Sequence, residues 1–340
     1  MQTMFRRTIA SVLLLMMLCF LPSGLALSYP QKPITLIVPY GAGGTADLAA
    51  RQIAMQLKKH LKVPVTVVNR GGASGSLGAA AALDAPSDGY TLLLAADSMG
   101  TMRVMGISAV SYHDFTPISP LVNDPKVIVV RKDSPYQSVK DLLTDMKERP
   151  GKVKMSYTGP GGSGHVQSLI LQHFGFQSAN IAYAGGADAI VAVLGRQVDF
   201  TNANYATVSS YAASGDLKLL AVCSTHRLPD QPDVPALSEV IEGAEALLSI
   251  PYTPLSLLVK KDVPKEACTV LRAAVREAVK EKEWVDFCQN NSLEKLYETY
   301  DTVEKAEAFF AAWEARVSWL LYDAKAAPNS PDQFDIPRPQ

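Results

Sequence analysis

The sequence predicts an α/β protein made of two halves, and three observations support this prediction. Residues 34–57 read as a buried strand, a glycine-rich turn and an amphipathic helix in immediate succession. Residues 152–174 repeat this arrangement around a second glycine-rich turn. Hydrophobic residues make up 48% of the 340-residue chain and charged residues only 19%, which is typical of a globular protein with a large core. We therefore expect one anion-binding turn in each half.

The first 28 residues have the pattern of a secretory signal peptide. Arg6 and Arg7 precede an uncharged run over 9–21, and small residues follow ahead of Tyr29. This run is shorter than the roughly 20 residues that cross a bilayer, which argues against a retained anchor. We predict that the protein is exported, with cleavage near Ser28 and Tyr29; the resemblance described below implies that its destination is the periplasm. Cleavage moves the formal net charge from −1 to −3, and no basic surface for nucleic acid is expected.

The first hundred residues predict a β-α-β-α-β unit. The apolar run over 34–39 is typical of a central strand that helices cover on both faces. The helix from about Ala46 places apolar side chains on one side, at Ala49, Ile53, Leu57 and Leu61. Strand 63–69, helix 77–83 and strand 90–95 follow, the last of them ending just before Ser98. This alternation is the repeating unit of a doubly wound sheet.

The middle of the chain predicts a second alternating half. Strand-like runs over 115–130 lead into it, and a helix over 139–148 precedes the second glycine-rich unit. The further elements expected here are strands at 180–183, 198–201 and 217–222 and helices at 188–194 and 205–213.

The C-terminal part predicts a return to the first half. A strand over 254–259 is followed by helices, of which 301–321 is the clearest. Asp301 and Glu304 have capping-box spacing, and an apolar stripe on this helix is expected to pack on the first half. The segment after Pro328 is expected to be loose.

The two glycine clusters match dinucleotide-binding spacing, but their context favours another anion. Residues 41–46 satisfy G-x-G-x-x-A and residues 159–164 satisfy G-x-G-x-x-G. The fingerprint needs an acidic residue at the end of the next strand, where Asn69 and Tyr183 stand instead. One such cluster is equally consistent with a plain turn between strand and helix. Two clusters in an exported protein favour a small carboxylate held between the halves, with no cofactor.

Enzymatic and metal sites have little support. Ser74 and Ser163 lie among glycines, but neither is in G-x-S-x-G. The five histidines lack metal-ligand spacing and the cysteines lack C-x-x-C, so we predict no metal site. Three cysteines follow the signal peptide. One bridge between Cys268 and Cys288 is compatible with an oxidising compartment, but we expect buried thiols.

Two side chains beside the glycine clusters have two interpretations each. His165 opens a helix next to Ser163, and it is either a ligand contact or an ordinary first-turn histidine. Asp47 either complements its helix dipole or accepts a hydrogen bond from a substrate amine or an ordered water.

A series of short motifs runs through the chain after the signal peptide. It comprises YPxKPI (29–34) with IVP (37–39), GGxxD (43–47) with AR (50–51), NRxGAxG (69–75) with Gly78, DGYTL (88–92), FxPI (115–118), GxGxSxH (159–165), YxG (183–185), QVD (197–199) and RxxxxxPDVP (227–235). In order and spacing these motifs resemble the periplasmic substrate-binding proteins of tripartite tricarboxylate transporters, also called the Bug family. The chain departs from the family pattern at Ala46, Gly71, Ala182, Ala184 and Asp188. The departures near Tyr183 could signal a different ligand.

This resemblance implies a two-lobed, hinged "Venus flytrap" fold of the type II periplasmic-binding-protein kind, each lobe a mostly parallel sheet flanked by helices. Lobe 1 would comprise 29–125 and 252–327 and lobe 2 would comprise 126–251, with a loose tail at 328–340. The first-lobe loop would bind a ligand carboxylate, partly through ordered waters, and the second-lobe loop would close over the other end. The implied binding residues are Tyr40, Gly41, Ala42, Gly43, Gly44, Asp47, Ser98, Gly161, Ser163, His165, Tyr183 and Gly185.

The function expected from the resemblance is that of a non-enzymatic receptor, acting as a monomer. It would trap a small organic carboxylate and deliver it to the membrane subunits of a tripartite transporter. Two alternatives remain open: a ligand-sensing partner of a membrane sensor kinase, and a secreted enzyme on the same scaffold. The enzyme would have only Asp47, His165 and Ser163 as candidate catalytic groups.

Overall fold

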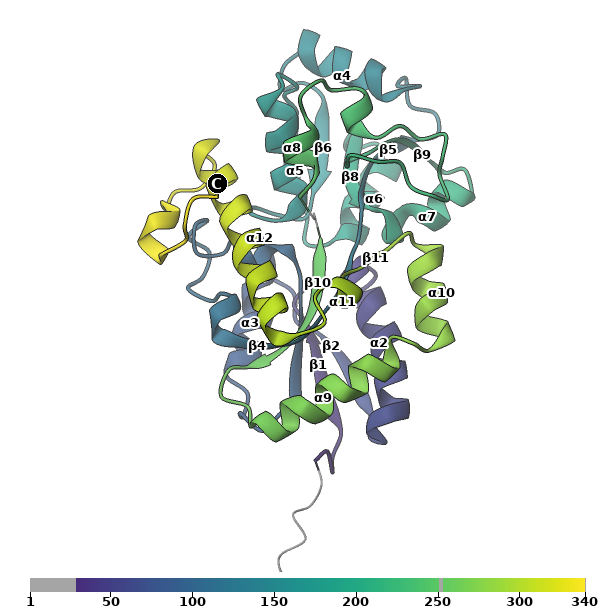
Figure 1. The fold of residues 1–340 in the computed structure, drawn as a ribbon. Coiled ribbons are helices and arrows are strands. Elements are labelled where there is room, and N and C mark those ends of the chain that lie inside the picture. Colours follow the sequence, from purple (N-terminus) through teal and green to yellow (C-terminus); the bar gives the residue numbers. More distant parts are fainter. Residues whose placement is uncertain (1–28, 251–252, 340) are drawn as a thin grey trace, which may run out of the picture. The chain divides into compact units, whose positions relative to one another are not determined.

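The computed structural model describes residues 29–250 and 253–339. The predicted signal peptide, residues 1–28, lies outside the described residues, which begin just after the predicted cleavage site. The compact unit Lys32–Gln340 contains two sheets with helices around them (Figure 1). We call the six-stranded sheet and its helices lobe 1, and the five-stranded sheet and its helices lobe 2.

Lobe 1 is built on a six-stranded sheet in the order β11-β4-β10-β3-β1-β2. Its strands are β1 (Ile34–Val38), β2 (Val65–Asn69), β3 (Thr91–Ala95), β4 (Phe115–Asn123), β10 (Pro254–Lys260) and β11 (Glu294–Lys295). One face carries α2 (Thr45–Leu61), α9 (Lys265–Ala278) and α10 (Lys282–Asn290), and the other carries α3 (Ser76–Leu83) and α12 (Val303–Asp323) (Figure 1). The short helix α11 (Leu296–Thr299) lies beside β4. As predicted, the apolar side of α2 is buried.

Lobe 2 is built on a five-stranded sheet in the order β7-β6-β8-β5-β9. Its strands are β5 (Lys126–Arg131), β6 (Lys154–Tyr157), β7 (Ala179–Ala182), β8 (Phe200–Asn204) and β9 (Leu217–Val222), and its helices are α4 (Val139–Glu148), α5 (Ser163–His173), α6 (Gly186–Leu194), α7 (Tyr205–Ala213) and α8 (Glu245–Leu248). Successive side chains of β5 point to opposite faces. Ile128 and Val130 therefore join the core under α4 and α5, while Val127 and Val129 join the core under α6 and α7.

The predicted α/β fold with two lobes is confirmed, and most strands of each sheet run in one direction, with a few reversed strands among them. In lobe 1, β1 pairs in parallel with β2 and β3, whereas β10 is antiparallel to β3 and β4, and β11 is antiparallel to β4. In lobe 2, β6 pairs in parallel with β7 and β8, whereas β5 is antiparallel to β8 and β9. The antiparallel strands β5 and β10 are the ones that enter lobe 2 from β4 and return from it. The division at 126 and 251 remains a prediction, because 251 and 252 are not described.

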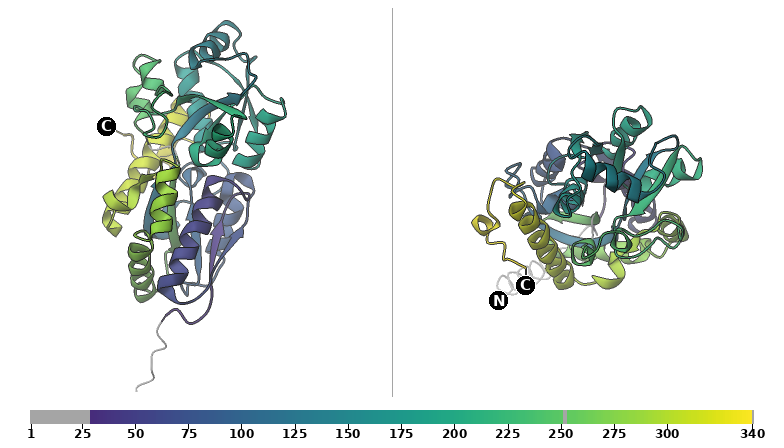
Figure 2. Two further views of the ribbon diagram at one scale, coloured as in Figure 1. Left: turned by 90° about the vertical axis from the view of Figure 1, so that its right-hand side faces the viewer. Right: turned by 90° about the horizontal axis from the view of Figure 1, so that it is seen from above.

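Helix α12 contacts both lobes, which differs from the expected packing on the first half alone. Phe309, Phe310 and Trp313 lie in the lobe 1 core with β3 and α3. Further along, Trp319 and Leu321 lie in the core that contains α4 and α5 of lobe 2. The helix therefore packs on β4 of lobe 1 and on α5 of lobe 2, and its yellow-green ribbon runs along both lobes (Figure 2).

The start of α12 lies two residues later than predicted. Thr302 is the N-cap, and its Oγ1 accepts a hydrogen bond from Lys305 N at 3.2 Å. Asp301 instead accepts from Lys305 Nζ at 2.8 Å, so the predicted Asp301–Glu304 box is not formed.

The expectation of a loose tail is corrected by its contacts. A 3₁₀ turn at Pro331–Phe334 follows α12, and Ile336 is buried. Trp319 Nε1 donates to Ile336 O at 3.2 Å, and the guanidinium of Arg338 lies 3.8 Å from the Trp319 ring centroid. Trp319 thus provides both an apolar face and a donor for the tail.

Candidate ligand site between the lobes

A small cavity lies where loops of the two lobes meet. Its volume is about 60 Å³. Lobe 1 lines it with Tyr40, Gly41, Gly44, Thr45, Ala46, Ala96 and Asp97, lobe 2 lines it with Thr158, Ser163, Gly185, Gly186, Asn204 and Thr207, and Thr253 and Leu255 come from the returning strand. Each loop follows the carboxyl end of a strand, which is where ligands bind in open α/β sheets.

Four helices, α2, α5, α6 and α7, begin at this cavity. Their N-cap residues are Gly44, Gly162, Gly185 and Asn204, and in none of them does the N-cap side chain bond a first-turn amide. The first N–H groups of a helix lack partners within the helix, and the helix dipole makes this end positive. The cavity is therefore surrounded by groups that stabilise negative charge.

Two of these helix ends already hold a carboxylate of the protein. The Asp97 carboxylate of lobe 1 accepts a hydrogen bond from Ser163 N, the first residue of α5 in lobe 2. Asp124 Oδ1 accepts from Ala206 N in the first turn of α7 at 3.4 Å. The first turns of α2 and α6 contain Asp47 and Asp188, but among the described residues no carboxylate accepts a hydrogen bond from a first-turn amide of these two helices.

The lobes are also joined directly at the second glycine-rich turn. Thr101 Oγ1 donates to Gly161 O at 2.8 Å, and Ser74 Oγ donates to Pro160 O at 3.0 Å. Gly161 has a φ of +79°, and a Cβ there would lie 2.6 Å from Thr101 Oγ1. Glycine at this position is thus required both by the backbone and by the close approach of the lobes.

Five of the predicted binding residues line the cavity: Tyr40, Gly41, Gly44, Ser163 and Gly185. Ala42 and Gly43 belong to the same loop, but they are exposed to solvent. The remaining five do not line the cavity: Asp47, Ser98, Gly161, His165 and Tyr183. Their contacts show what each does.

Asp47 holds the first glycine-rich loop in place. Its carboxylate accepts from Gly43 N and Arg51 Nε, both at 3.0 Å, and from Asn69 Nδ2 at 3.0 Å. Burial alone would raise the pKa of Asp47, but these hydrogen bonds and the charge of Arg51 lower it overall. The side chain is 3% exposed and does not line the cavity. Asn69, the residue that replaces the expected dinucleotide acid, is therefore part of the loop's support.

Ser98 positions Tyr40. Ser98 Oγ donates its one proton to Ser74 O at 2.6 Å, so the Tyr40 hydroxyl must donate to Ser98 Oγ. Burial raises the pKa of Tyr40, and the nearby charge of Asp97 raises it further. Tyr40 is therefore neutral, and its oxygen has only lone pairs left to offer.

His165 and Tyr183 are bonded within lobe 2. His165 Nδ1 accepts from Gly161 N at 3.1 Å, and burial lowers the pKa of His165, so the ring is neutral. The Tyr183 hydroxyl donates to Gln197 Oε1 at 3.2 Å. His165 therefore fixes the second glycine-rich turn, as Asp47 fixes the first.

Several residues of the site were not predicted from the sequence, above all Asp97 and Asn204. Asp97 directly precedes the predicted Ser98, and Asn204 ends β8. Both positions lie at or just after the carboxyl end of a strand, which is the signal that could have found them. Lys126 Nζ donates to Asn204 Oδ1 at 2.8 Å, which assigns the amide orientation. Asn204 Nδ2 is buried, and the Asn204 side chain also interacts with the Asp124 carboxylate, whose pKa this contact helps to lower.

Two buried charges lie at the passage from β4 to β5. Asp124 is fully buried and accepts from Thr45 Oγ1 at 2.6 Å. Lys126 is 2% exposed and also donates to Asn202 O at 3.3 Å. Burial lowers the pKa of Lys126, while the charges of Asp97 and Asp124 act in the opposite direction.

Asp124 is expected to make the stability of the protein depend on pH. Burial raises its pKa from 3.8 to about 6, although the hydrogen bonds from Thr45 and Ala206 oppose the shift. The folded protein then retains this proton to higher pH than the unfolded chain does. Between about pH 4 and pH 6 the free energy of unfolding should therefore fall as pH rises, by about 3 kcal/mol.

Urea unfolding from pH 4 to pH 7.5 tests this for the unaltered protein and Asp124→Asn. The asparagine cannot titrate, so the variant should become more stable relative to the unaltered protein as pH rises. Asp84→Asn, an exposed lobe 1 acid, is the control and should follow the unaltered protein. Parallel curves for the unaltered protein and Asp124→Asn would contradict the assignment.

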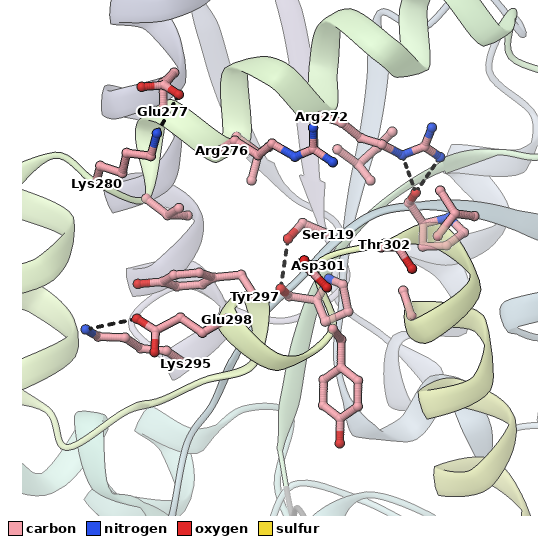
Figure 3. A pocket seen from close by; sticks show the side chains of 18 of the residues that line it. Ser119, Arg272, Arg276, Glu277, Lys280, Lys295, Tyr297, Glu298, Asp301 and Thr302 are labelled. Atoms are coloured by element: carbon pink, nitrogen blue, oxygen red, sulfur yellow. Dashed lines mark hydrogen bonds and ion pairs between the residues drawn. The ribbon is translucent and has the colours of Figure 1, made fainter.

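A larger cavity of about 920 Å³ lies within lobe 1, between β4, α9, α11 and the start of α12 (Figure 3). Arg272 donates to the backbone oxygen of Pro117, and Lys280 pairs with Glu277 at 2.7 Å. Because its lining comes from one lobe only, movement of the lobes would not enclose a ligand there. The cavity between the lobes is the better candidate.

Other kinds of site find little support in 29–250 and 253–339. No group of three or more His, Cys, Asp or Glu side chains could hold a metal ion there. Cys223, Cys268 and Cys288 are free and buried, which confirms the expected buried thiols. None of the helices in this part of the chain is both long and apolar enough to cross a bilayer.

Two lobes with a cavity between them, surrounded by helix N-termini, define a solute-binding protein. The family model described as "Tripartite tricarboxylate transporter family receptor" matches residues 49–312. The chain therefore belongs to this receptor family, and the predicted resemblance is confirmed. Receptors of this family are periplasmic solute-binding proteins and not enzymes, and they work with transporter membrane subunits.

Individual relatives agree with this assignment. Protein BugT of Bordetella pertussis (strain Tohama I) is 31% identical over 264 residues, which cover 76% of this chain and 80% of the relative. The solved periplasmic binding protein BugD is 27% identical with a TM-score of 0.81, covering 88% of this chain and 99% of that chain. A TctC solute-binding protein from Polaromonas is 32% identical with a TM-score of 0.62, covering 87% of this chain and 99% of that chain.

Proposed function

We propose that this chain is an exported receptor that traps a small organic carboxylate in the cavity between its lobes and delivers it to a tripartite transporter. The first 28 residues would act as a cleaved export signal, and the receptor would act as a monomer. The observation that carries the proposal is the set of helix N-termini around the cavity, with the amide side chain of Asn204 among the residues that line it.

The binding geometry would use the two helix ends that hold no protein carboxylate. First-turn amides of α2, around Thr45 and Ala46, and of α6, around Gly186, would donate to the ligand carboxylate together with Asn204 Nδ2. Tyr40, Gly41, Gly44, Ser163 and Gly185 would form the walls. A ligand that touches both lobes stabilises their closed arrangement by the difference in its affinity for the two arrangements.

A binding screen tests the proposal. Mono-, di- and tricarboxylates, amino acids and aromatic acids would be added to the mature chain, with thermal unfolding followed by titration calorimetry. At least one acid should raise the unfolding temperature, because a ligand at 100 times its Kd adds about 2.7 kcal/mol to stability. Binding of none of these carboxylates would contradict the proposal.

The site assignment has its own test with the acid that binds. Asn204→Ala removes a buried donor and should weaken binding by about 1 to 3 kcal/mol. Asn290→Ala, an exposed asparagine at the end of α10, is the matched control and should bind normally. Equal affinity of both variants would place the carboxylate elsewhere.

A further inference from the structure

Asp97 gives the cavity a negative charge. Among the described residues that line the cavity, it is the only aspartate, glutamate, lysine, arginine or histidine. It lies two residues after the end of β3 and is 7% exposed. A Cβ on Gly162 would lie 3.3 Å from Asp97 Oδ2, so the carboxylate of lobe 1 reaches the backbone of lobe 2.

The charges behind the cavity do not cancel this negative charge. Lys126 is the one buried cation there, and it lies near two carboxylates, Asp97 and Asp124. One cation against two anions leaves a net negative charge in a poorly solvated region. A ligand with two carboxylates would add like charges to it, and like charges at short range are costly where water is excluded.

The positive helix ends also have limited capacity. Asp97 occupies the N-terminus of α5, and Asp124 occupies that of α7. The N-termini of α2 and α6 remain, on opposite sides of one small cavity. They can hold one ligand carboxylate between them, but they leave no separate place for a second.

The hydroxyl groups of the cavity act mainly as acceptors. Thr45 donates its proton to Asp124, Thr207 donates to Asn204 O at 2.7 Å, and Thr253 donates to Ser163 Oγ at 3.2 Å. Tyr40 donates to Ser98, as described above. Each of these oxygens has only lone pairs to offer a ligand. A ligand that brings its own N–H donors would satisfy them together with Asp97.

We propose that the carboxylate recognised by this receptor carries an ammonium group, so that the ligand is a compact zwitterionic amino acid. Its carboxylate lies at the N-termini of α2 and α6, and its ammonium group pairs with Asp97 and the hydroxyl oxygens. The inference rests on the proposed function. Size agrees with it: at roughly 10 to 15 Å³ per water-sized group, the cavity holds about five such groups in this arrangement of the lobes.

Matched ligand pairs test the inference without any variant. Calorimetry on the mature chain would compare glycine with acetate, alanine and β-alanine with propionate, 4-aminobutyrate with butyrate, and aspartate with succinate. In the best-binding pair the amino acid should bind at least 100-fold more tightly than the acid that lacks the amine. A plain acid that binds as tightly as its amino partner overturns the inference and leaves the proposed function standing. If none of these amino acids, none of the paired acids without an amine and no acid of the wider screen binds, the proposed function fails as well.

Asp97→Asn then tests the residue itself. Asparagine keeps an acceptor for Ser163 N but loses the charge, so the preference for the amino acid should fall below 10-fold. Asp84→Asn removes an exposed charge from the same lobe and should keep the full preference. An unchanged preference in folded Asp97→Asn would overturn the assignment of the ammonium group to Asp97.

Discussion

Replacing Gly185 by leucine should abolish ligand capture and leave the protein folded. Gly185 has φ −158° and ψ 169°, an extended conformation that any residue adopts. A Cβ at this position would lie 4.0 Å from Gly41 Cα in the opposite lobe. The rest of a leucine side chain therefore has to enter the cavity or hold the lobes apart. We expect Kd to rise about a thousandfold, which corresponds to about 4 kcal/mol.

Calorimetry with the acid found by screening measures this loss, and small-angle scattering measures the separation of the lobes. Ala182→Leu adds a similar side chain to the neighbouring exposed strand β7 and serves as the control. The control should bind ligand normally, and both variants should unfold within a few degrees of the unaltered protein. Normal binding by Gly185→Leu would mean that the ligand does not lie between these two loops.

The elements of the fold could be predicted because their signals are local. The apolar run of β1, the glycine turn and the one-sided helix α2 are each encoded within a few residues, and the structure has all three in place. The antiparallel return of β10 between β3 and β4 could not be predicted this way, since a strand's apolar pattern does not state its partner or direction. The extra packing of α12 on lobe 2 depends likewise on contacts distant in sequence.

The walls of the site were predicted better than its charges. Glycine clusters mark a strand–helix turn in any context, so Gly41, Gly44 and Gly185 were found. Asp47 was expected to be the first side chain to test, yet its oxygens are used by Gly43, Arg51 and Asn69. Which carboxylate faces the cavity depends on the partners that the fold brings to it. Asp97 meets its partner Ser163 across 66 positions of sequence, and no pattern within β3 shows that contact.

Substitution of Gly78 in α3 is expected to destabilise the protein strongly. A Cβ there would lie 2.6 Å from Pro39 Cα and 2.7 Å from Arg70 O. Both are backbone atoms, so no side-chain rotation can relieve the overlap, and α3 would have to move away from β1. Overpacking of this kind typically costs about 1 to 3 kcal/mol. Because the Cβ overlaps two separate backbone segments, the cost should lie at the upper end of this range, about 3 kcal/mol. Alanine regains about 1 kcal/mol of this cost, because its helix propensity is higher than that of glycine. Gly78→Ala should then lose about 2 kcal/mol net, and Gly78→Val, with two further methyl groups and no such gain, about 4 kcal/mol.

Urea unfolding of both variants measures these losses, with Gly186→Ala as the matched control. Gly186 opens α6, and a Cβ there would meet no atom within 4 Å. The same glycine-to-alanine change should therefore be neutral or stabilising in α6, because it reduces the freedom of the unfolded chain without a clash. A graded loss confined to position 78 would show that close packing of α3 on β1, and not glycine's flexibility, is what requires this residue. Equal effects at 78 and 186 would contradict that explanation.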